Sequence, residues 1–413
     1  MTTFFYSTEG ASWLNTEGWL SNESICDWRG ITCVDGRVTK LNQNKNGLAG
    51  SLPAELSALS SLSTLEVFMN SIGGALPTEL FIPSITGLDL EENNFTGELF
   101  SEDLLSLDGL EILRASINGF TGTIPEDIDR LSSLTELWIG ENENFSAGII
   151  PNSITSLTKL SSIIAYNCGL TGTLPENIGN LTDVRNLDLH NNGMTGSIPG
   201  SLGSMTNLKK LFLEDNDFTG TIPDSTSQLT ELQRFFANDN ALIGPIPDYS
   251  SFSKLKLIVL ANNTLTGSMP AFSSPVLEFL ALHNNALSGN IPDIIFTSEP
   301  LRIVYLNNNT FTGPIPANYV NAIKLQDLYL NDNTLTGTIP SPVPGQLPNI
   351  TEILLNGNRL SGDVPDGLCD LREALPIQFF ALHADCNPTP PNDDPNNPCQ
   401  TGCCTDCFSG KVV

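Results

Sequence analysis

LQDLYLNDNTLTGTIP, residues 325–340, contains every residue type of a unit that recurs from Leu41 to Pro365. Asn333 of this stretch has equivalents about 24 residues apart, and Cys168 fills the one slot that lacks an asparagine. The equivalents are Asn46, Asn70, Asn93, Asn118, Asn142, Asn192, Asn216, Asn240, Asn263, Asn285, Asn309 and Asn358. A fixed period of this length, repeated 14 times, predicts one elongated stack of copies with a continuous core.

The residues of the unit alternate in a way that predicts a short strand. Leu328 and Leu330 alternate with Asp327, Tyr329 and Asn331, so one face is buried and the other is exposed. A buried asparagine at position 333 needs backbone partners in its own turn and in the neighbouring turn. We therefore expect the asparagine column to join successive repeats, with Cys168 as a free packing thiol in that column.

The unit ends in a turn phrase, LTGTIP at residues 335–340, which returns as FTGTIP at 120–125 and MTGSIP at 194–199. Gly337 permits a backbone conformation that other residues avoid, and Pro340 ends the ladder. This LxGxIP signature resembles the plant-type leucine-rich repeats of receptor-like kinase ectodomains and polygalacturonase-inhibiting proteins. The resemblance implies an α/β repeat solenoid: a right-handed superhelix of 14 repeats with a parallel β-sheet on its concave face.

The ends of the chain differ from the array at 41–365. Residues 1–40 carry the spacing CxWxGxxC at Cys26, Trp28, Gly30 and Cys33, and resemble the N-terminal cap of plant-type repeat proteins. Three tryptophans would cover the first repeat, and a short disulfide loop would close the cap. Two cysteines without a nearby histidine supply too few ligands for zinc.

The C-terminal end is predicted as a cap at 366–386, closed by Cys369 and Cys386, followed by a Pro/Asn/Asp linker and Cys-rich tail at 387–413. The tail cysteines are Cys399, Cys403, Cys404 and Cys407. Their spacing suits either disulfides or a metal. The ALHADC and CCTDC segments resemble secreted or surface leucine-rich-repeat proteins of diatoms, which favours disulfides and no metal.

Charge and histidine content narrow the possible functions. Acidic residues outnumber basic ones by 46 to 18, and the net charge of −28 argues against nucleic acid and anionic membranes as partners. The histidines, His190, His283 and His383, lie far apart in the repeat register, and no glycine-rich phosphate loop is present. We therefore expect no enzyme activity and no cofactor, and a basic ligand is permitted.

Cysteines at both ends indicate an extracellular or cell-surface protein, and several N-x-Ser/Thr sequons are compatible with secretion. The glycosylation candidates are Asn22, Asn94, Asn144, Asn180, Asn262, Asn308 and Asn349. The first residues, MTTFFYSTEG, lack the pattern of a signal peptide. A targeting segment absent from this chain or an upstream start explains this better than an intracellular location with reduced thiols. A membrane anchor would also lie outside this sequence.

The residue between the two strand leucines is expected to face the concave surface, and many copies are aromatic. The predicted ligand-binding residues are Trp138, Phe212, Phe236, Tyr305 and Tyr329 of this column, and Tyr166 of a flanking column. Aromatic residues also suit strands for purely structural reasons. The functional hypothesis is recognition of a protein, peptide or glycan, as in a receptor ectodomain, and the oligomeric state stays open.

Two alternatives remain. The first is a secreted inhibitor of a cell-wall hydrolase, which would need no anchor. The second is binding to ice or to a polysaccharide surface through a threonine column one residue before the turn glycine. This column holds Thr96, Thr121, Thr171, Thr195, Thr219, Thr266, Thr312 and Thr336.

Overall fold

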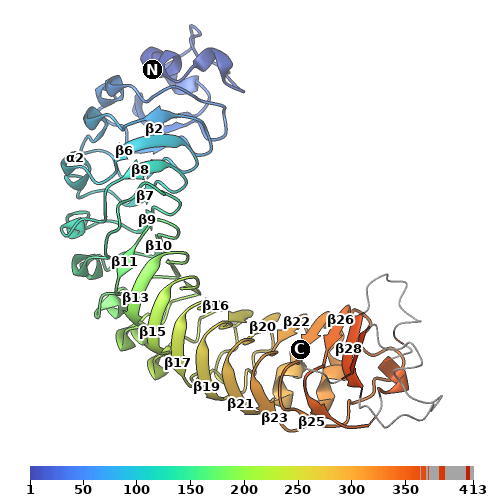
Figure 1. The fold of residues 1–413 in the computed structure, drawn as a ribbon. Coiled ribbons are helices and arrows are strands. Elements are labelled where there is room, and N and C mark those ends of the chain that lie inside the picture. The colour runs from blue at the N-terminus through green and yellow to red at the C-terminus, as the bar shows by residue number, and fades with distance from the viewer. Residues whose placement is uncertain (363, 369–370, 372–380, 387–405, 410–413) are drawn as a thin grey trace. The chain divides into compact units, whose positions relative to one another are not determined.

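A computed structural model describes residues 1–362, 364–368, 371, 381–386 and 406–409 of the chain (Figure 1). The fold consists of two compact units, Met1–Leu208 and Lys209–Val413, and each is described by itself. In both units, strands line one side of the repeats, and short helical turns lie on the other side. None of the helices in the described part of the chain is long and apolar enough to cross a membrane.

The first unit contains a parallel ladder with one strand per repeat. Its strands are β2 (Arg37–Asn42), β3 (Thr64–Glu66), β5 (Gly87–Asp89), β7 (Ile112–Arg114), β9 (Glu136–Trp138), β10 (Ser162–Ile164) and β12 (Asn186–Asp188). Equivalent residues pair directly, as Leu88 with Leu113 and Leu113 with Leu137. These leucines are fully buried. The alternation in the sequence therefore predicted both the strands and their buried face correctly.

The second unit continues the same pattern. Its strands are β14 (Lys210–Phe212), β16 (Arg234–Phe236), β18 (Leu257–Val259), β20 (Phe279–Ala281), β22 (Ile303–Tyr305), β24 (Asp327–Tyr329), β26 (Glu352–Leu354), β28 (Ala381–Cys386) and β29 (Asp406–Ser409). All neighbouring strands in this ladder are parallel. The sheet predicted for the repeat solenoid is confirmed.

The last strand lies within the segment 387–413, which was predicted as a linker and tail. In this segment β29 pairs with β28 and extends the ladder. A strand at the end of a sheet leaves a row of backbone groups unpaired, and a further strand satisfies them. The cysteine pairings predicted at this end lie outside the described residues or their described side chains.

A second ladder, which is interrupted and therefore divided into separate sheets, follows the turn glycines. In the first unit its strands are β4 (Gly73–Gly74), β6 (Asn94–Glu98), β8 (Gly119–Thr121), β11 (Thr171–Gly172) and β13 (Gly193–Ser197). In the second unit they are β15 (Asp217–Thr221), β17 (Ala241–Gly244), β19 (Thr264–Ser268), β21 (Ala286–Asn290), β23 (Thr310–Thr312), β25 (Thr336–Gly337) and β27 (Arg359–Leu360). Gly337 has φ +80°, so the turn needs its glycine.

The opposite side of each repeat is formed mostly by single 3₁₀ turns. They are η3 (Ala54–Ala58), η4 (Thr78–Leu80), η5 (Ile128–Arg130), η6 (Asn152–Ser156), η7 (Ile178–Asn180), η8 (Gly200–Ser204), η9 (Asp224–Gln228), η10 (Asp293–Thr297) and η11 (Ala317–Asn321). Several follow a proline such as Pro199 or Pro316, whose fixed φ starts the turn. In the repeat that lacks this proline, α2 (Glu102–Leu105) begins after Ser101, whose hydroxyl accepts from the Leu104 amide.

The asparagine column joins the repeats as predicted. The Asn333 side-chain amide donates to the Leu330 carbonyl of its own turn at 3.1 Å and to the Leu306 carbonyl of the preceding repeat at 3.0 Å. Its oxygen accepts from the Phe311 amide at 3.0 Å. One buried side chain thus satisfies backbone groups in two successive repeats.

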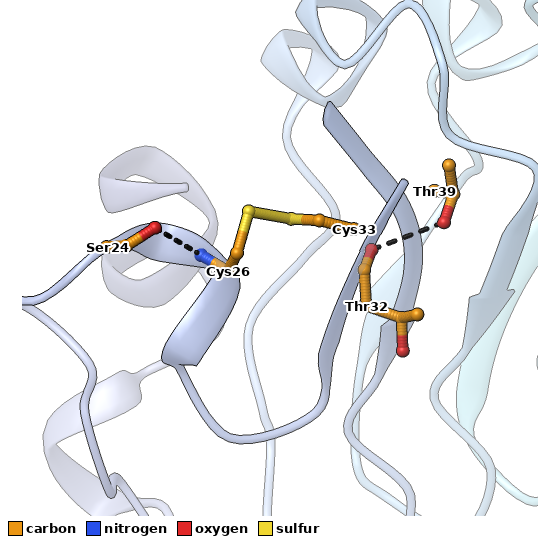
Figure 2. Close-up of a disulfide and its surroundings, with 5 residues drawn as sticks. All are labelled: Ser24, Cys26, Thr32, Cys33 and Thr39. Atoms are coloured by element: carbon orange, nitrogen blue, oxygen red, sulfur yellow. Dashed lines mark hydrogen bonds between the residues drawn. A yellow bond between two sulfur atoms is a disulfide. The ribbon is translucent and has the colours of Figure 1, made fainter. Parts of the chain in front are cut away.

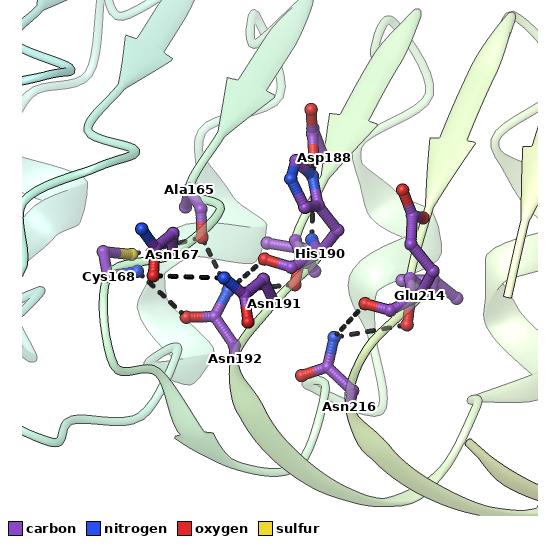
Figure 3. Close-up of polar contacts among 11 residues, drawn as sticks. Ala165, Asn167, Cys168, Asp188, His190, Asn191, Asn192, Glu214 and Asn216 are labelled. Carbon is purple, nitrogen blue, oxygen red and sulfur yellow. Dashed lines mark hydrogen bonds and ion pairs between the residues drawn. The ribbon is translucent and has the colours of Figure 1, made fainter. Parts of the chain in front are cut away.

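Figure 3 shows the same arrangement around the one cysteine in the column. Asn192 donates to the Ala165 carbonyl at 2.9 Å and accepts from the Cys168 amide at 3.2 Å. Cys168 is a free, buried thiol whose Sγ donates to the Ala165 carbonyl at 3.1 Å. Burial raises the pKa of this thiol to about 12, so the thiol stays protonated and its role is to pack in the core.

The N-terminal cap combines α1 (Thr2–Ser7), η1 (Gly10–Ser12), η2 (Ile25–Asp27) and β1 (Ile31–Val34), which pairs antiparallel with β2. Cys26 and Cys33 form a disulfide between η2 and β1, in agreement with the sequence prediction (Figure 2). The Ser24 hydroxyl accepts from the Cys26 amide at 3.3 Å, and the Thr39 hydroxyl donates to the Thr32 carbonyl at 3.3 Å.

The cap explains why the first repeat has a polar residue at a strand leucine position. Gln43 stands where a strand leucine is expected and is only 2% exposed. Its amide donates to the Arg29 carbonyl at 2.7 Å, and its oxygen accepts from Asn46 at 2.7 Å. Gly30 lies so close to the Asn42 carbonyl that a Cβ would approach it to 1.9 Å. The irregular repeat is therefore the joint between cap and array.

Candidate functional site

The residues predicted to bind ligand lie on the strand face, which we define in each unit as the side of the first ladder that carries the residue between the two strand leucines. In the second unit this face holds a stacked tyrosine pair. The rings of Tyr305 and Tyr329 lie 4.4 Å apart at 23°, and Phe279 meets Tyr305 edge-on at 5.8 Å. Strands in register place these rings one above the other.

Each tyrosine hydroxyl is bound to a carboxylate of the next strand. Tyr305 donates to Asp327 at 3.2 Å, and Tyr329 donates to Glu352. The pKa of both tyrosines is raised, mainly by burial and also by these carboxylates. The hydroxyls therefore remain donors, and the pair presents aromatic rings with negative charge at their edges. This combination suits a ligand that carries both an apolar and a basic group.

A second aromatic pair, Phe212 and Phe236, lies on the same face with its ring centroids 5.0 Å apart. Between the two pairs the column passes through Val259 and through Ala281, which is 1% exposed. The sequence suggested a continuous, solvent-facing stripe. The structure shows half-buried rings in two groups, because each ring is partly covered by its neighbour along the ladder.

In the first unit the predicted aromatic residues are already covered by charged side chains. The Arg114 guanidinium lies 4.3 Å from the centroid of the Trp138 ring. It also forms ion pairs with Glu136 at 2.8 Å and Asp89 at 3.3 Å. The Trp138 indole nitrogen donates to the Ser162 hydroxyl at 3.0 Å. This part of the face is a polar network rather than an open aromatic surface.

Tyr166 is covered in a similar way. Its ring stacks on His190 with centroids 4.6 Å apart at 5°, and the His190 Nδ1 lies 2.6 Å from Asp188. Burial and the nearby carboxylates, led by Glu141, raise the pKa of Tyr166 to about 12. Sequence reasoning missed Arg114 and His190, although both stand in repeat columns that contain the predicted aromatics.

The first unit also concentrates carboxylates. Burial, and after it the charges of Asp89 and Glu92, raise the pKa of Glu91 to about 7. Burial also raises the pKa of Asp89, against the opposing effect of Arg114. Among the residues that the structure describes, no three acidic, histidine or cysteine side chains are grouped as a metal site.

The raised pKa of Glu91 gives a prediction for stability against pH. Between about pH 4.5 and 7 the folded state binds a proton that the unfolded state has lost, so stability falls as pH rises through this window. Glu91→Gln removes the carboxyl group whose protonation makes the stability depend on pH. We expect its melting temperature to equal that of the parent below pH 4.5 and to exceed it by a constant amount above pH 7. Glu176→Gln, at an exposed side chain, controls for the lost charge, and a difference independent of pH would contradict the assignment.

The threonine column lies on the second ladder. Seven of its eight members are exposed, and Thr171 is half-buried. In the second unit Ile243 and Ser288 occupy equivalent positions, so the row of threonines there is interrupted. An interrupted row matches a regular lattice less well than a continuous one, and the strand face is the better candidate.

All seven sequon asparagines are exposed. Asn262 and Asn308 belong to a surface hydrogen-bonded row, in which Asn262 donates to Asp239 at 2.7 Å and Asn308 donates to Asn284 at 2.6 Å. Exposure makes glycosylation of these residues sterically feasible.

Comparison with known proteins agrees with this geometry. The sequence pattern of the Leucine Rich Repeat family matches residues 183–205, 207–229, 324–345 and 349–371. MDIS1-interacting receptor like kinase 1 from Arabidopsis thaliana is 36% identical over 110 residues, which are 26% of this chain and 11% of that kinase. Receptor-like protein 36 from the same plant is 37% identical over 90 residues, 22% of this chain and 12% of that protein. The chain thus spans only about a tenth of the length of these relatives.

Solved structures extend the likeness over most of the chain. The Arabidopsis receptor kinase HAESA, solved with the peptide hormone IDA and the co-receptor SERK1, has a TM-score of 0.75 and 31% identity. That match covers 88% of this chain and 66% of the HAESA chain. The plant peptide hormone receptor RGFR1, solved with RGF2, has a TM-score of 0.69 and 26% identity over 87% of this chain and 69% of that receptor chain. The chain contains leucine-rich repeats, and its solenoid is similar to the ectodomains of plant receptor-like kinases.

Proposed function

We propose that this chain is a non-enzymatic, extracellular recognition module that binds a peptide or a protein segment on the strand face of its second unit. The stacked pair of Tyr305 and Tyr329, with Asp327 and Glu352 at the hydroxyl edges, carries this proposal. Rigid aromatic side chains provide much of the binding energy in protein interfaces. The peptide-bound state of the HAESA and RGFR1 ectodomains supports a peptide as the first ligand class to test.

The charge of the face defines the ligand further. The carboxylates of Asp327 and Glu352 stay close to the rings, and the whole chain has a net charge of −28. A ligand with Arg or Lys next to an apolar side chain would place its cation against these groups. Association should therefore weaken as salt increases.

The test uses peptides selected from a phage-displayed random library against the intact chain. Tyr305→Ala and Tyr329→Ala are each expected to weaken binding of a selected peptide about 30-fold, which corresponds to about 2 kcal/mol. Tyr305→Phe keeps the ring and should retain most of the affinity. Ile294→Ala, at an exposed side chain of η10, is the control for the opposite side of the repeats.

Melting temperatures of the same variants separate binding from folding, because the two rings are half-buried and their truncation has a stability cost. Peptides that bind both tyrosine variants as well as the parent, but lose binding to Ile294→Ala, would refute the strand face as the recognition surface.

A further inference from the structure

Every regular repeat has one residue in the left-handed backbone region, directly before the column asparagine. In the second unit six of these residues are asparagine or aspartate, with φ between 52° and 54°, and the last is Gly357 with φ 69°. The six are Asp215, Asp239, Asn262, Asn284, Asn308 and Asp332. Asparagine and aspartate tolerate this conformation better than other residues with a side chain. The first unit departs from this rule over five successive repeats, at Lys45, Met69, Glu92, Ile117 and Glu141.

The two apolar members of that set are unusual. Ile117 has φ 56°, and a β-branched residue is a genuine outlier in this region because its Cβ crowds the backbone. Met69 also has φ 56° and is 46% exposed, so its side chain is not held there by burial in the core. Backbone strain of this kind persists at positions where the side chain has another role.

A third apolar side chain joins them from the cap. Leu14 is 80% exposed, yet its backbone is fixed, because its amide donates to the Asn46 carbonyl at 2.8 Å. The next amide, that of Asn15, donates to the Asn46 side chain at 2.7 Å. The Cγ of Leu14 also lies 3.4 Å from the position that a Cβ on Gly47 would occupy. The cap thus presents a large apolar group in a fixed place.

Leu14, Met69 and Ile117 line one groove of about 600 Å³ in the first unit. Its size falls in the range of sites that accept a few side chains of a ligand. Lys45 and Glu92 also line the groove, and the Lys45 ammonium lies 5.0 Å from the centre of the Phe68 ring. Glu92 supplies the carboxylate among the residues that line the groove.

We propose that this groove binds an extended peptide segment of a partner protein through an aliphatic or aromatic side chain, with an adjacent Arg or Lys of the peptide against Glu92. The three apolar residues supply the contact for the apolar side chain. A basic residue complements the carboxylate of Glu92. The site is separate from the tyrosine pair of the second unit and does not depend on it.

One feature of the groove determines how it has to be tested. Asn94, which begins a sequon and is exposed, also lines the groove. A glycan at this position would crowd the ligand. The protein is therefore produced in the bacterial periplasm, where the Cys26–Cys33 disulfide can form and eukaryotic N-glycosylation does not take place.

The test again uses random twelve-residue peptides displayed on phage, selected on the parent and separately on the double variant Met69→Asn/Ile117→Asn. Asparagine occurs in this column in five other repeats and suits its backbone conformation, so the double variant should fold with a melting temperature equal to the parent's or about 2 °C higher. We expect the parent alone to enrich peptides that pair an apolar residue with Arg or Lys. Fluorescein-labelled copies should bind the double variant at least tenfold more weakly, and Glu92→Gln should reduce their salt dependence.

The peptide selection has two control variants and three outcomes that would contradict the proposed groove. Ile243→Asn removes a 50% exposed isoleucine outside the groove and should leave these peptides bound, as should Tyr305→Ala in the second unit. Recovery of the same peptides on parent and double variant would refute the site. A clear fall in melting temperature would show that Met69 and Ile117 serve the fold instead. Concentration-dependent dimers of the parent that are lost in the double variant would identify a second copy of this chain, not a peptide, as the occupant.

Discussion

Asn309→Ala is expected to lower the free energy of unfolding by about 3 kcal/mol, one of the two largest effects of a single substitution that we predict. The Asn309 side chain is 8% exposed and donates to the Leu282 carbonyl at 3.0 Å and the Leu306 carbonyl at 3.2 Å. Its oxygen accepts from the Leu287 amide at 2.9 Å. Alanine would leave these buried backbone groups unpaired in two adjacent repeats, and each such group is costly.

The neighbouring residue provides a matched control. Asn308 is exposed, has φ 52°, and its side-chain amide donates to the exposed Asn284 side chain at 2.6 Å. Asn308→Gly suits the same backbone conformation, so it should change stability by less than about 1 kcal/mol. Urea titrations of both variants, followed by circular dichroism, measure the difference. Equal stability of the two variants would show that the column asparagines do not hold the stack together.

The strands, their register and the asparagine column could be predicted from sequence because a repeat contacts mainly its neighbours. The alternation around Leu328 and Leu330 indicates which face of the strand is buried. The recurrence every 24 residues or so indicates that the neighbouring repeats cover the buried side chains. The chemistry of a buried amide then fixes the role of Asn333. No long-range folding information was needed for these features.

The state of the strand face could not be predicted in the same way. Trp138 and Tyr166 were identified as aromatic, but their covering by Arg114 and His190 depends on how side chains of adjacent strands orient across the ladder. The pairing of β29 with β28 was also missed, because the short segment 406–409 has no repeat-like pattern of its own. One signal was present and overlooked: Met69 and Ile117 are apolar in a column that otherwise carries polar or charged residues and one glycine.

Trp19→Ala is expected to destabilise the N-terminal cap by about 4 kcal/mol. The Trp19 side chain is 7% exposed, and its ring lies 4.8 Å from Trp13 and 5.2 Å from Trp28, centroid to centroid. It also contacts Phe4 and Phe5 at 5.9 and 6.0 Å. Its indole nitrogen donates to the Arg29 carbonyl at 3.0 Å, so the substitution removes both the centre of an aromatic cluster and a hydrogen bond.

The effect can be measured selectively, because three of the four tryptophans of the chain lie in the cap. In Trp19→Ala, the fluorescence of the remaining cap tryptophans should change at a lower urea concentration than the circular dichroism of the repeats. Terminal repeats depend on a cap to cover their apolar face, so early opening of the cap should also promote aggregation at high protein concentration. Tyr6→Ala is the control, since Tyr6 belongs to the same segment but is 67% exposed. Coincident fluorescence and dichroism transitions in Trp19→Ala, shifted no further than in Tyr6→Ala, would mean that the aromatic cluster contributes little and that the disulfide and β1 hold the cap in place.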